Sequence, residues 1–318
     1  MRLLHNFGNF NSIFGANFSP RAYLAINAID EWLVFKGGVS TGYKTPPLNY
    51  LMNGIVAISR TGSAPSYGNP SLTPETSVNY ELSALSNNEF FNTSLTGFYT
   101  KFNDRISSLS YSAGQQVADT NFVCPIGASC SYYVNISEAK AYGAEFALGI
   151  KPINVGYGDI SFNAAYTFTK TKVTKAPSGV GNRLTEVPLH AVNGTLSYDT
   201  EHFGVYVKEE FKSGFYRAPG SGSSANNYNY VRNKLGENYD DYTLTHLGAY
   251  IKPTKNLQVN FVVYNLFNKN FLDYDLESYN RLYNNGNGVV QHSSLIYANR
   301  YNYIREGRRY YLSFQLDF

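Results

Sequence analysis

Hydrophobic and polar residues alternate with a period of two along most of the chain. The clearest case is the C-terminal stretch, in which Tyr310, Leu312, Phe314, Leu316 and Phe318 share one face. Successive side chains of a β-strand point to opposite faces of a sheet, so this alternation predicts strands. About eleven such segments are found. They cover residues 14–27, 31–43, 77–87, 91–104, 138–151, 158–173, 188–199, 203–216, 241–252, 256–269 and 301–318.

The connections between these segments alternate between short and long. The short connections are a few residues near 28–30, followed by SNNE, NVGYG, DTEH and PTKN. The long connections cover 44–76, 105–137, 174–187, 217–240 and 270–300. Short turns at one end and long loops at the other are typical of an outer-membrane barrel, whereas a sandwich would scatter its long loops. The pattern therefore predicts an all-β, antiparallel transmembrane barrel.

One predicted strand, at 203–216, shows what the two faces would contact. Phe203 and Val207 fall on an apolar face, and Lys208 and Glu210 fall on the opposite face. A charged inner face suits a wet lumen better than a packed core. Glu209 would face lipid by strict alternation, which indicates either a bulge, a register slip or a position near the membrane interface.

Composition and charge narrow the class further. Aromatic residues make up 16% and charged residues only 15% of the 318 residues, against roughly 25% charged in ordinary soluble domains. No run approaches the roughly 18 apolar residues of a transmembrane helix. The net charge of +3, without a basic run, argues against nucleic-acid binding. The N-terminus lacks the apolar segment of a secretory signal, so Met1 is not expected to be a natural export start.

The sequence offers no catalytic constellation. Its five histidines are dispersed, and neither a G-x-S-x-G elbow nor a zinc-type histidine spacing occurs. We therefore expect neither an enzyme nor a cofactor or metal site. Cys124 and Cys130 lie in one polar stretch, where an exported loop would join them as a disulfide; a reduced pair is the alternative.

Several stretches resemble TonB-dependent outer-membrane receptors. Tyr43-Lys44-Thr45-Pro46 and Asn69-Pro70-Ser71-Leu72 are similar to two boxes that flank a long extracellular loop in that family. AKAYGAEFALGIKP, with Gly143 and Glu145, resembles another family strand, as do VYNLFNKNF and the terminal GRRYYLSFQLDF. The matches follow the family's order over nearly the whole chain. They resemble the catecholate-siderophore and colicin receptors most closely.

The resemblance implies that 1–318 is one unit, the C-terminal part of a barrel of about 22 strands around a plugged lumen. The plug domain and the segment that binds TonB are not recognised, so we expect no transport by this chain alone. The implied setting is the Gram-negative outer membrane and its lipid. The implied partners are a ferric siderophore, the TonB complex acting through the missing plug, and the barrel-assembly machinery. That machinery would recognise the final strand with Tyr310, Leu312, Phe314, Leu316 and Phe318.

The implied function is TonB-energised uptake of a ferric siderophore, an anionic catecholate. Loop cations and aromatic rings are the expected contacts, although each could equally be a solvated loop charge or an interface ring. The candidates are Arg60, Tyr216, Arg217, Arg232, Lys234, Arg281, Tyr283 and Arg300.

Two other readings stay open. Haem receptors of this family commonly carry a histidine between the two boxes, but residues 48–68 contain none, and only His292 falls in an expected outer loop. Haem or another iron source is thus the alternative ligand. A stand-alone structural or adhesive barrel is the alternative of another class.

Overall fold

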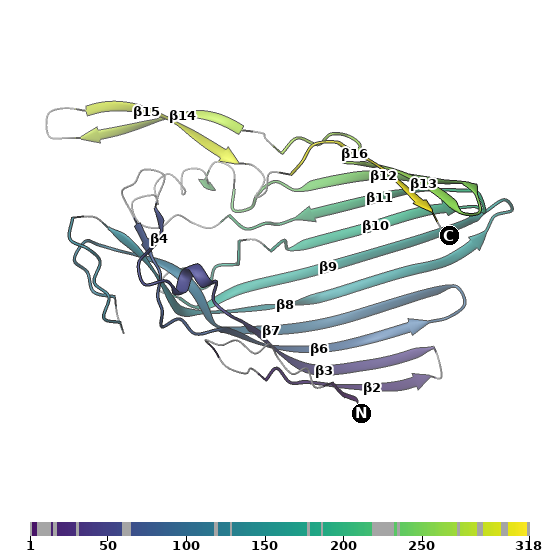
Figure 1. Cartoon of the computed structure of the whole chain (residues 1–318), viewed down its shortest axis with the longest axis horizontal. Helices are drawn as coiled ribbons and strands as arrows, with labels where there is room; N and C mark the ends of the chain where they lie inside the picture. The colour runs from purple at the N-terminus through teal and green to yellow at the C-terminus, as the bar shows by residue number, and fades with distance from the viewer. Residues whose placement is uncertain are drawn as a thin grey trace.

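The described part of the chain is mostly β-structure. The computed structural model describes residues 2–4, 14, 18–29, 32–58, 65–117, 120–127, 129–176, 179–185, 187–217, 232–233, 236–271, 274–284, 289–299 and 305–316. These residues form a 14-stranded sheet and a separate two-stranded sheet. Figure 1 shows the large sheet as one curved wall. Within these ranges no helix has the length and apolar character of a membrane span.

The strands and the 3-10 helix found among the described residues have the following bounds. They are β1 (Arg2–Leu4), β2 (Arg21–Ile29), β3 (Leu33–Lys44), η1 (Leu48–Leu51), β4 (Ile55–Ile58), β5 (Pro65–Tyr67), β6 (Glu75–Asn87), β7 (Phe91–Tyr111), β8 (Cys130–Asn154), β9 (Asp159–Lys175), β10 (His190–Asp199), β11 (Phe203–Ser213), β12 (Tyr242–Thr254), β13 (Leu257–Tyr264), β14 (Tyr274–Asn284), β15 (Val289–Asn299) and β16 (Arg309–Leu316).

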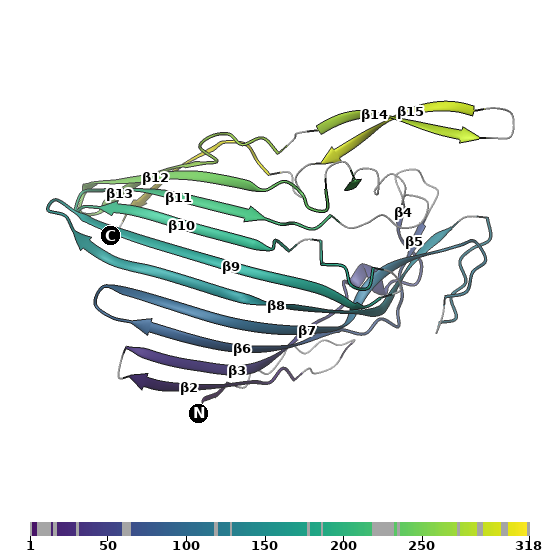
Figure 2. The same cartoon turned by 180° about the vertical axis from the view of Figure 1, so that it is seen from behind.

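The main sheet follows the chain order closely. Its path is β1-β2-β3-β6-β7-β8-β9-β10-β11-β12-β13-β16, and neighbours along this path pair antiparallel. The predicted antiparallel all-β fold is confirmed, and each predicted strand overlaps an observed one. Within the described residues the path runs from one edge at β1 to another at β16, so the sheet forms an open trough (Figures 1 and 2).

The two ends of the trough differ as the sequence predicted. Short turns join β2 to β3, β6 to β7, β8 to β9 and β10 to β11 at one end (right in Figure 1). The long connections, with η1, β4, β5 and the β14–β15 hairpin, gather at the other end. We call these the turn end and the loop end.

Apolar side chains cover the convex outer face of the sheet. Continuous register places Phe146, Tyr166, Val192 and Phe211 side by side across four strands on this face. Leu82 is 66% exposed there, which a soluble protein would avoid but lipid would favour. The alternate positions, which face the inside of the trough, are mostly polar. The apolar-out, polar-in prediction is therefore confirmed.

Glu209 lies on the apolar face without any bulge. The pairing of β11 with β10 and with β12 runs without a shift through this residue. Its carboxylate is exposed and accepts a hydrogen bond from Thr245 Oγ1 at 2.7 Å. The bulge and the register slip considered above are both wrong, and Glu209 is an outward-facing carboxylate.

Three regions predicted as loops are strands in part. The predicted loop at 44–76 contains the short strands β4 and β5. β7 and β8 continue through much of 105–137, because the Ser, Tyr and Val residues there still alternate and still pair. The predicted loop at 270–300 contains the β14–β15 hairpin, whose residues pair without a shift. Polar loops rich in Asn and Tyr can form ladders when hydrogen bonding between strands substitutes for apolar burial.

Candidate ligand-binding surface

The structure describes only part of the predicted loop contacts. Arg60, Lys234 and Arg300 lie outside the described residues. Arg281 and Tyr283 belong to β14, but their side chains are outside the description. Tyr216, Arg217 and Arg232 are described, and all three lie at the loop end, in the connection between β11 and β12.

Tyr216 is the centre of a cluster of arginines. The centroid of the Tyr216 ring lies 5.4 Å from the guanidinium carbon of Arg183 and 5.5 Å from that of Arg232. Arg183 also donates to the carbonyl of Gly214, and Arg232 forms an ion pair with Glu237. The sequence reasoning missed Arg183, because it lies in a different loop and only pairing across the loops brings it here.

Tyr216 and Arg217 are more buried than ligand contacts would be. They are 6% and 5% exposed, and Arg217 stacks at 4.1 Å on the ring of Tyr239. Burial lowers the pKa of the Arg217 guanidinium, while Tyr239 and Asp240 oppose that shift. An arginine remains cationic under such shifts, so Arg217 is a buried cation whose partial compensation comes from Tyr239 and Asp240.

A small apolar core holds this loop against the sheet. Phe215, Tyr242, Leu244 and Phe271 are all buried together. The backbone N–H of Arg217 donates to Glu237 O, and that of Tyr239 donates to Phe215 O, each at 2.8 Å. The cluster around Tyr216 therefore sits on a fixed base.

Directly inside the trough lies a polar cleft of about 650 Å³. Its charged lining comes from three strands and the approach to β16, and includes Lys208, Glu210, His246, Arg305, Glu306 and Arg309, with the rings of Tyr206 and Tyr264. Lys208 Nζ pairs with Glu210 Oε1 at 2.7 Å. Such a mixture of cations and phenol rings can hold an anionic aromatic ligand.

His246 has a defined tautomer in this cleft. Its Nδ1 accepts a hydrogen bond from the backbone N–H of Asn265 at 3.2 Å, so the proton of a neutral ring sits on Nε2. That nitrogen lies 3.7 Å from Glu210 Oε1. The imidazole therefore presents an N–H toward a carboxylate and holds no free lone pair for a metal.

The other histidines are scattered. His190 lies on the outer face, where its Nδ1 is 2.8 Å from the hydroxyl of Tyr166, and His202 lies in the β10–β11 turn. His292 belongs to β15 rather than to an irregular loop. Within the described part of the chain, no three His, Cys, Asp or Glu residues are grouped as a metal site.

The first two long connections are fastened together at the loop end. Asn69 donates from Nδ2 to Tyr133 O at 2.9 Å, and β5 pairs in parallel with β8. Asn135 accepts from the N–H of Thr73 and donates to its carbonyl, both at 2.8 Å. The second box recognised in the sequence, Asn69 to Leu72, thus anchors one loop to a neighbouring strand.

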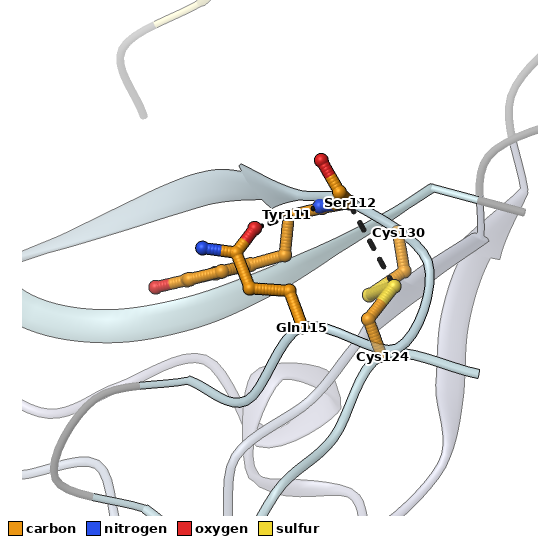
Figure 3. Close-up of a disulfide and its surroundings, with 5 residues drawn as sticks. All are labelled: Tyr111, Ser112, Gln115, Cys124 and Cys130. Atoms are coloured by element: carbon orange, nitrogen blue, oxygen red, sulfur yellow. Dashed lines mark hydrogen bonds between the residues drawn. A yellow bond between two sulfur atoms is a disulfide. The ribbon is translucent and has the colours of Figure 1, made fainter. Parts of the chain in front are cut away.

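A disulfide lies at the start of β8. The structure joins Cys124 to Cys130 (Figure 3), and the two residues are 0% and 1% exposed. Nearby, Gln115 accepts from the Ser112 N–H at 2.9 Å. Val117, Tyr132 and Val134 form a second buried cluster there, so the connection is compact.

The sequence matches a known family. The family "TonB dependent receptor-like, beta-barrel" matches residues 4–266. The iron-regulated outer membrane virulence protein of Vibrio cholerae is 31% identical over 307 residues, which cover 96% of this chain and 40% of that protein. The ferric enterobactin receptor PirA of Pseudomonas aeruginosa is 26% identical, over 97% of this chain and 38% of its own.

Solved structures show the same fold. A mutant of the ferric enterobactin receptor PfeA of Pseudomonas aeruginosa superimposes with a TM-score of 0.61 at 22% identity, covering 96% of this chain and 41% of that one. The siderophore receptor PirA of Acinetobacter baumannii gives 0.61 at 23% identity, covering 96% and 42%. The chain spans about two fifths of the length of the relatives it matches.

Proposed function

Because the chain belongs to the TonB-dependent receptor β-barrel family, we propose that it takes part in TonB-energised uptake of a ferric siderophore. Members of the family are receptors and transporters in the outer membrane of Gram-negative bacteria rather than enzymes. The observation that carries the proposal is the family match together with relatives that are named as siderophore and enterobactin receptors.

An anionic catecholate is the ligand class that we propose. Its support is the lining of the lumenal cleft, where Arg305, Arg309 and Lys208 stand beside phenol rings. Catecholate iron complexes combine negative charge with aromatic faces, and arginine and tyrosine side chains complement both. The cluster around Tyr216 would support the rim of the cleft, and its cation Arg232 is partly accessible, with a side chain 20% exposed.

The remaining predicted loop contacts stay proposals of the same kind. Arg60, Lys234, Arg281, Tyr283 and Arg300 would add charge and rings from the long connections. The proposed partners are the siderophore, the TonB complex acting through a plug, and the barrel-assembly machinery. That machinery would recognise β16 with its outer-face residues Tyr310, Leu312, Phe314 and Leu316, and the terminal Phe318.

A haem-type ligand is the second candidate. The hemoglobin and hemoglobin-haptoglobin-binding protein A of Haemophilus influenzae is 27% identical over 95% of this chain. Against this ligand stands His246, whose Nδ1 accepts from the backbone and whose Nε2 faces Glu210. An axial haem ligand needs a free imidazole lone pair.

The test measures uptake of iron by iron-starved cells with and without the gene for this chain. We expect loss of uptake from a ferric tris-catecholate, with uptake from a ferric hydroxamate unchanged. Loss of growth on haem alone would support the second candidate instead. Unchanged uptake from all three sources would overturn the proposal.

A pair of variants tests the cleft separately. Arg305→Ala with Arg309→Ala should weaken binding of the catecholate roughly tenfold, since two charge-assisted contacts are removed. The matched control is Lys151→Ala with Lys255→Ala, which removes two positive charges at the turn end. If both double variants bind the catecholate equally well, the cleft is not the binding site.

A further inference from the structure

Three lysines stand in a row across the outer face of the sheet. Lys101 of β7 lies directly opposite Lys140 of β8, and Lys140 lies directly opposite Lys172 of β9. Lys170 takes the next outer-face position of β9, opposite Tyr142. Figure 2 shows the three strands side by side. We call these four residues the lysine row.

The repulsion between the lysines of such a row destabilises the folded sheet unless an anion neutralises their charge. Directly opposed side chains on antiparallel strands have Cβ atoms about 5 Å apart, and like charges in that position destabilise the sheet. In the described part of the chain one carboxylate forms ion pairs here, namely Glu138, which lies 3.6 Å from Lys101 Nζ and 3.7 Å from Lys175 Nζ. One glutamate shared by two lysines leaves most of the positive charge unneutralised.

The lysine row has a defined depth in the membrane. The adjacent outer-face positions, one step toward the turn end, are the aromatic residues Tyr80, Tyr99 and Tyr142, which register places side by side. Beyond them begins the apolar face with Leu82, Leu95 and Phe146. Aromatic residues of a membrane barrel mark the boundary between hydrocarbon and headgroups. The row therefore lies at headgroup level.

The leaflet follows from the two ends of the trough. Long connections of an outer-membrane barrel are extracellular and short turns are periplasmic. Three residues of the row, Lys101, Lys140 and Lys172, lie on the loop-end side of the aromatic boundary. Lys170 lies level with that boundary, so the row meets the headgroups of the outer leaflet. Lys101 of the row is accessible there, with its side chain 51% exposed, and Lys170 and Lys172 are exposed too.

We propose that the lysine row binds the phosphate groups of a phosphorylated glycolipid in the outer leaflet. Lysine is a point charge suited to phosphate, and basic clusters at a membrane surface attract anionic headgroups. Lys101 and Lys172 are two strand spacings apart, roughly 10 Å. That span fits a headgroup carrying two phosphates better than one carrying a single phosphate.

The proposal is independent of the transported ligand. The lysine row lies on the outer face, whereas the cleft proposed for the siderophore lies on the inner face. A result that contradicts lipid binding would therefore say nothing against the proposed siderophore uptake. Conversely, a result that contradicts siderophore uptake would say nothing against lipid binding.

The test measures the thermal unfolding midpoint of the native protein, purified from outer membranes and freed of lipid in detergent. Bisphosphorylated lipid A should raise the midpoint, because a ligand that binds the folded state stabilises it. Lys140→Gln with Lys172→Gln should lose most of that rise. Without lipid the same double variant should unfold at the same or a higher temperature, because the opposed charges are gone.

Controls separate the charge and the lipid. Lys151→Gln with Lys255→Gln changes the charge equally at the turn end and should respond to lipid A as the unaltered protein does. Dephosphorylated lipid A and inorganic phosphate should have little effect. An equal rise in the lysine-row variant would overturn the site, and an equal rise with phosphatidylglycerol would overturn the glycolipid. If the double variant does not fold, Lys172→Gln alone is measured. We expect this single variant to lose up to half of the rise in the unfolding midpoint that lipid A causes in the unaltered protein.

Discussion

At the scale of single residues, the most informative positions break the pattern of the face on which they lie. Glu209 is a carboxylate on the apolar outer face, between Val207 and Phe211 along β11. Gly143 shows the opposite constraint on the inner face, because a Cβ there would collide with the carbonyl of Phe168 on β9. Backbone approach of this kind admits only glycine. The glycine of the AKAYGAEFALGIKP stretch thus has a packing reason.

Replacing Glu209 should stabilise the protein in a bilayer. Glu209→Gln keeps an acceptor for the hydroxyl of Thr245 but removes a charge from the lipid face. We expect the free energy of unfolding to rise by about 1 kcal/mol, since charges on this face are unfavourable by up to a few kcal/mol depending on depth. Denaturant titration in liposomes measures this change. Glu145→Gln on the inner face serves as the control, and an equal gain there would contradict the explanation.

Substitution of Asn135 should affect the protein more than the position of this residue on a polar strand suggests. The side-chain amide of Asn135 forms hydrogen bonds with the backbone N–H and carbonyl of Thr73, and it also donates to the carbonyl of Asp104 at 2.7 Å. Asn135→Ala would remove three hydrogen bonds at an exposed site, where water can replace each one, so we expect a loss of about 1 kcal/mol in the free energy of unfolding. We expect faster proteolysis between β5 and β6, measured by limited digestion of intact cells. Asn154→Ala at the turn end is the control and should leave that rate unchanged.

At the scale of elements, the loop end is built by strands that continue beyond the membrane. β7 and β8 are 21 and 25 residues long, well above the roughly 10 residues that cross a bilayer. Their outer parts pair with each other, and β8 also receives β5 from the first long connection. Neighbouring loops therefore form one folded unit above the sheet.

The Cys124–Cys130 bridge should matter to that unit and not to the sheet. A bridge that closes such a short loop contributes about 2 kcal/mol through the entropy of the unfolded chain. Cys124→Ser with Cys130→Ser should leave the heat-modifiable migration of the barrel intact while exposing residues 112–130 to protease. Mass spectrometry of the released peptides measures this protease cleavage. Loss of folded barrel in the same variant would show that the bridge acts on the whole sheet.

The sequence predicted the membrane strands well because each carries its own alternation. The inner and outer faces of β9 and β16 could be read directly from their residues. The loop end could not be read in this way. The approach of Arg183 to Tyr216 and of Asn69 to Tyr133 depends on contacts between distant segments, which single-sequence periodicity does not encode. The lysine row was hidden for the same reason, because it appears only once β7, β8 and β9 are placed in register.

At the scale of the whole molecule, the sheet is a lipid-facing wall whose outer and inner sides have different chemistry. β16 illustrates it, since Phe314 lies on the outer face opposite Val259, and Ser313 lies on the inner face opposite Asn260. The final strand thus carries both the apolar surface for lipid and part of the polar lining. Assembly in the membrane requires both.

The two faces of β16 should differ in their tolerance of charge. Phe314→Asp should reduce the amount of folded protein in outer membranes several-fold, because it places a carboxylate against lipid. Ser313→Asp, at the neighbouring inner-face position, should have little effect. The measurement is the heat-modifiable fraction in isolated outer membranes. An equal loss from both substitutions would argue that β16 tolerates no charge for reasons unrelated to lipid.

The extension of β7 and β8 beyond the lysine row has an immunological consequence. From Lys101 to Tyr111 the strand rises by roughly 25 Å after allowance for its tilt, and Ile126, between the two bridged cysteines, is 95% exposed. The segment from Cys124 to Cys130 would therefore be among the first parts of the cell surface that an antibody meets. A short cyclic peptide closed by the same two cysteines would display that epitope without the membrane.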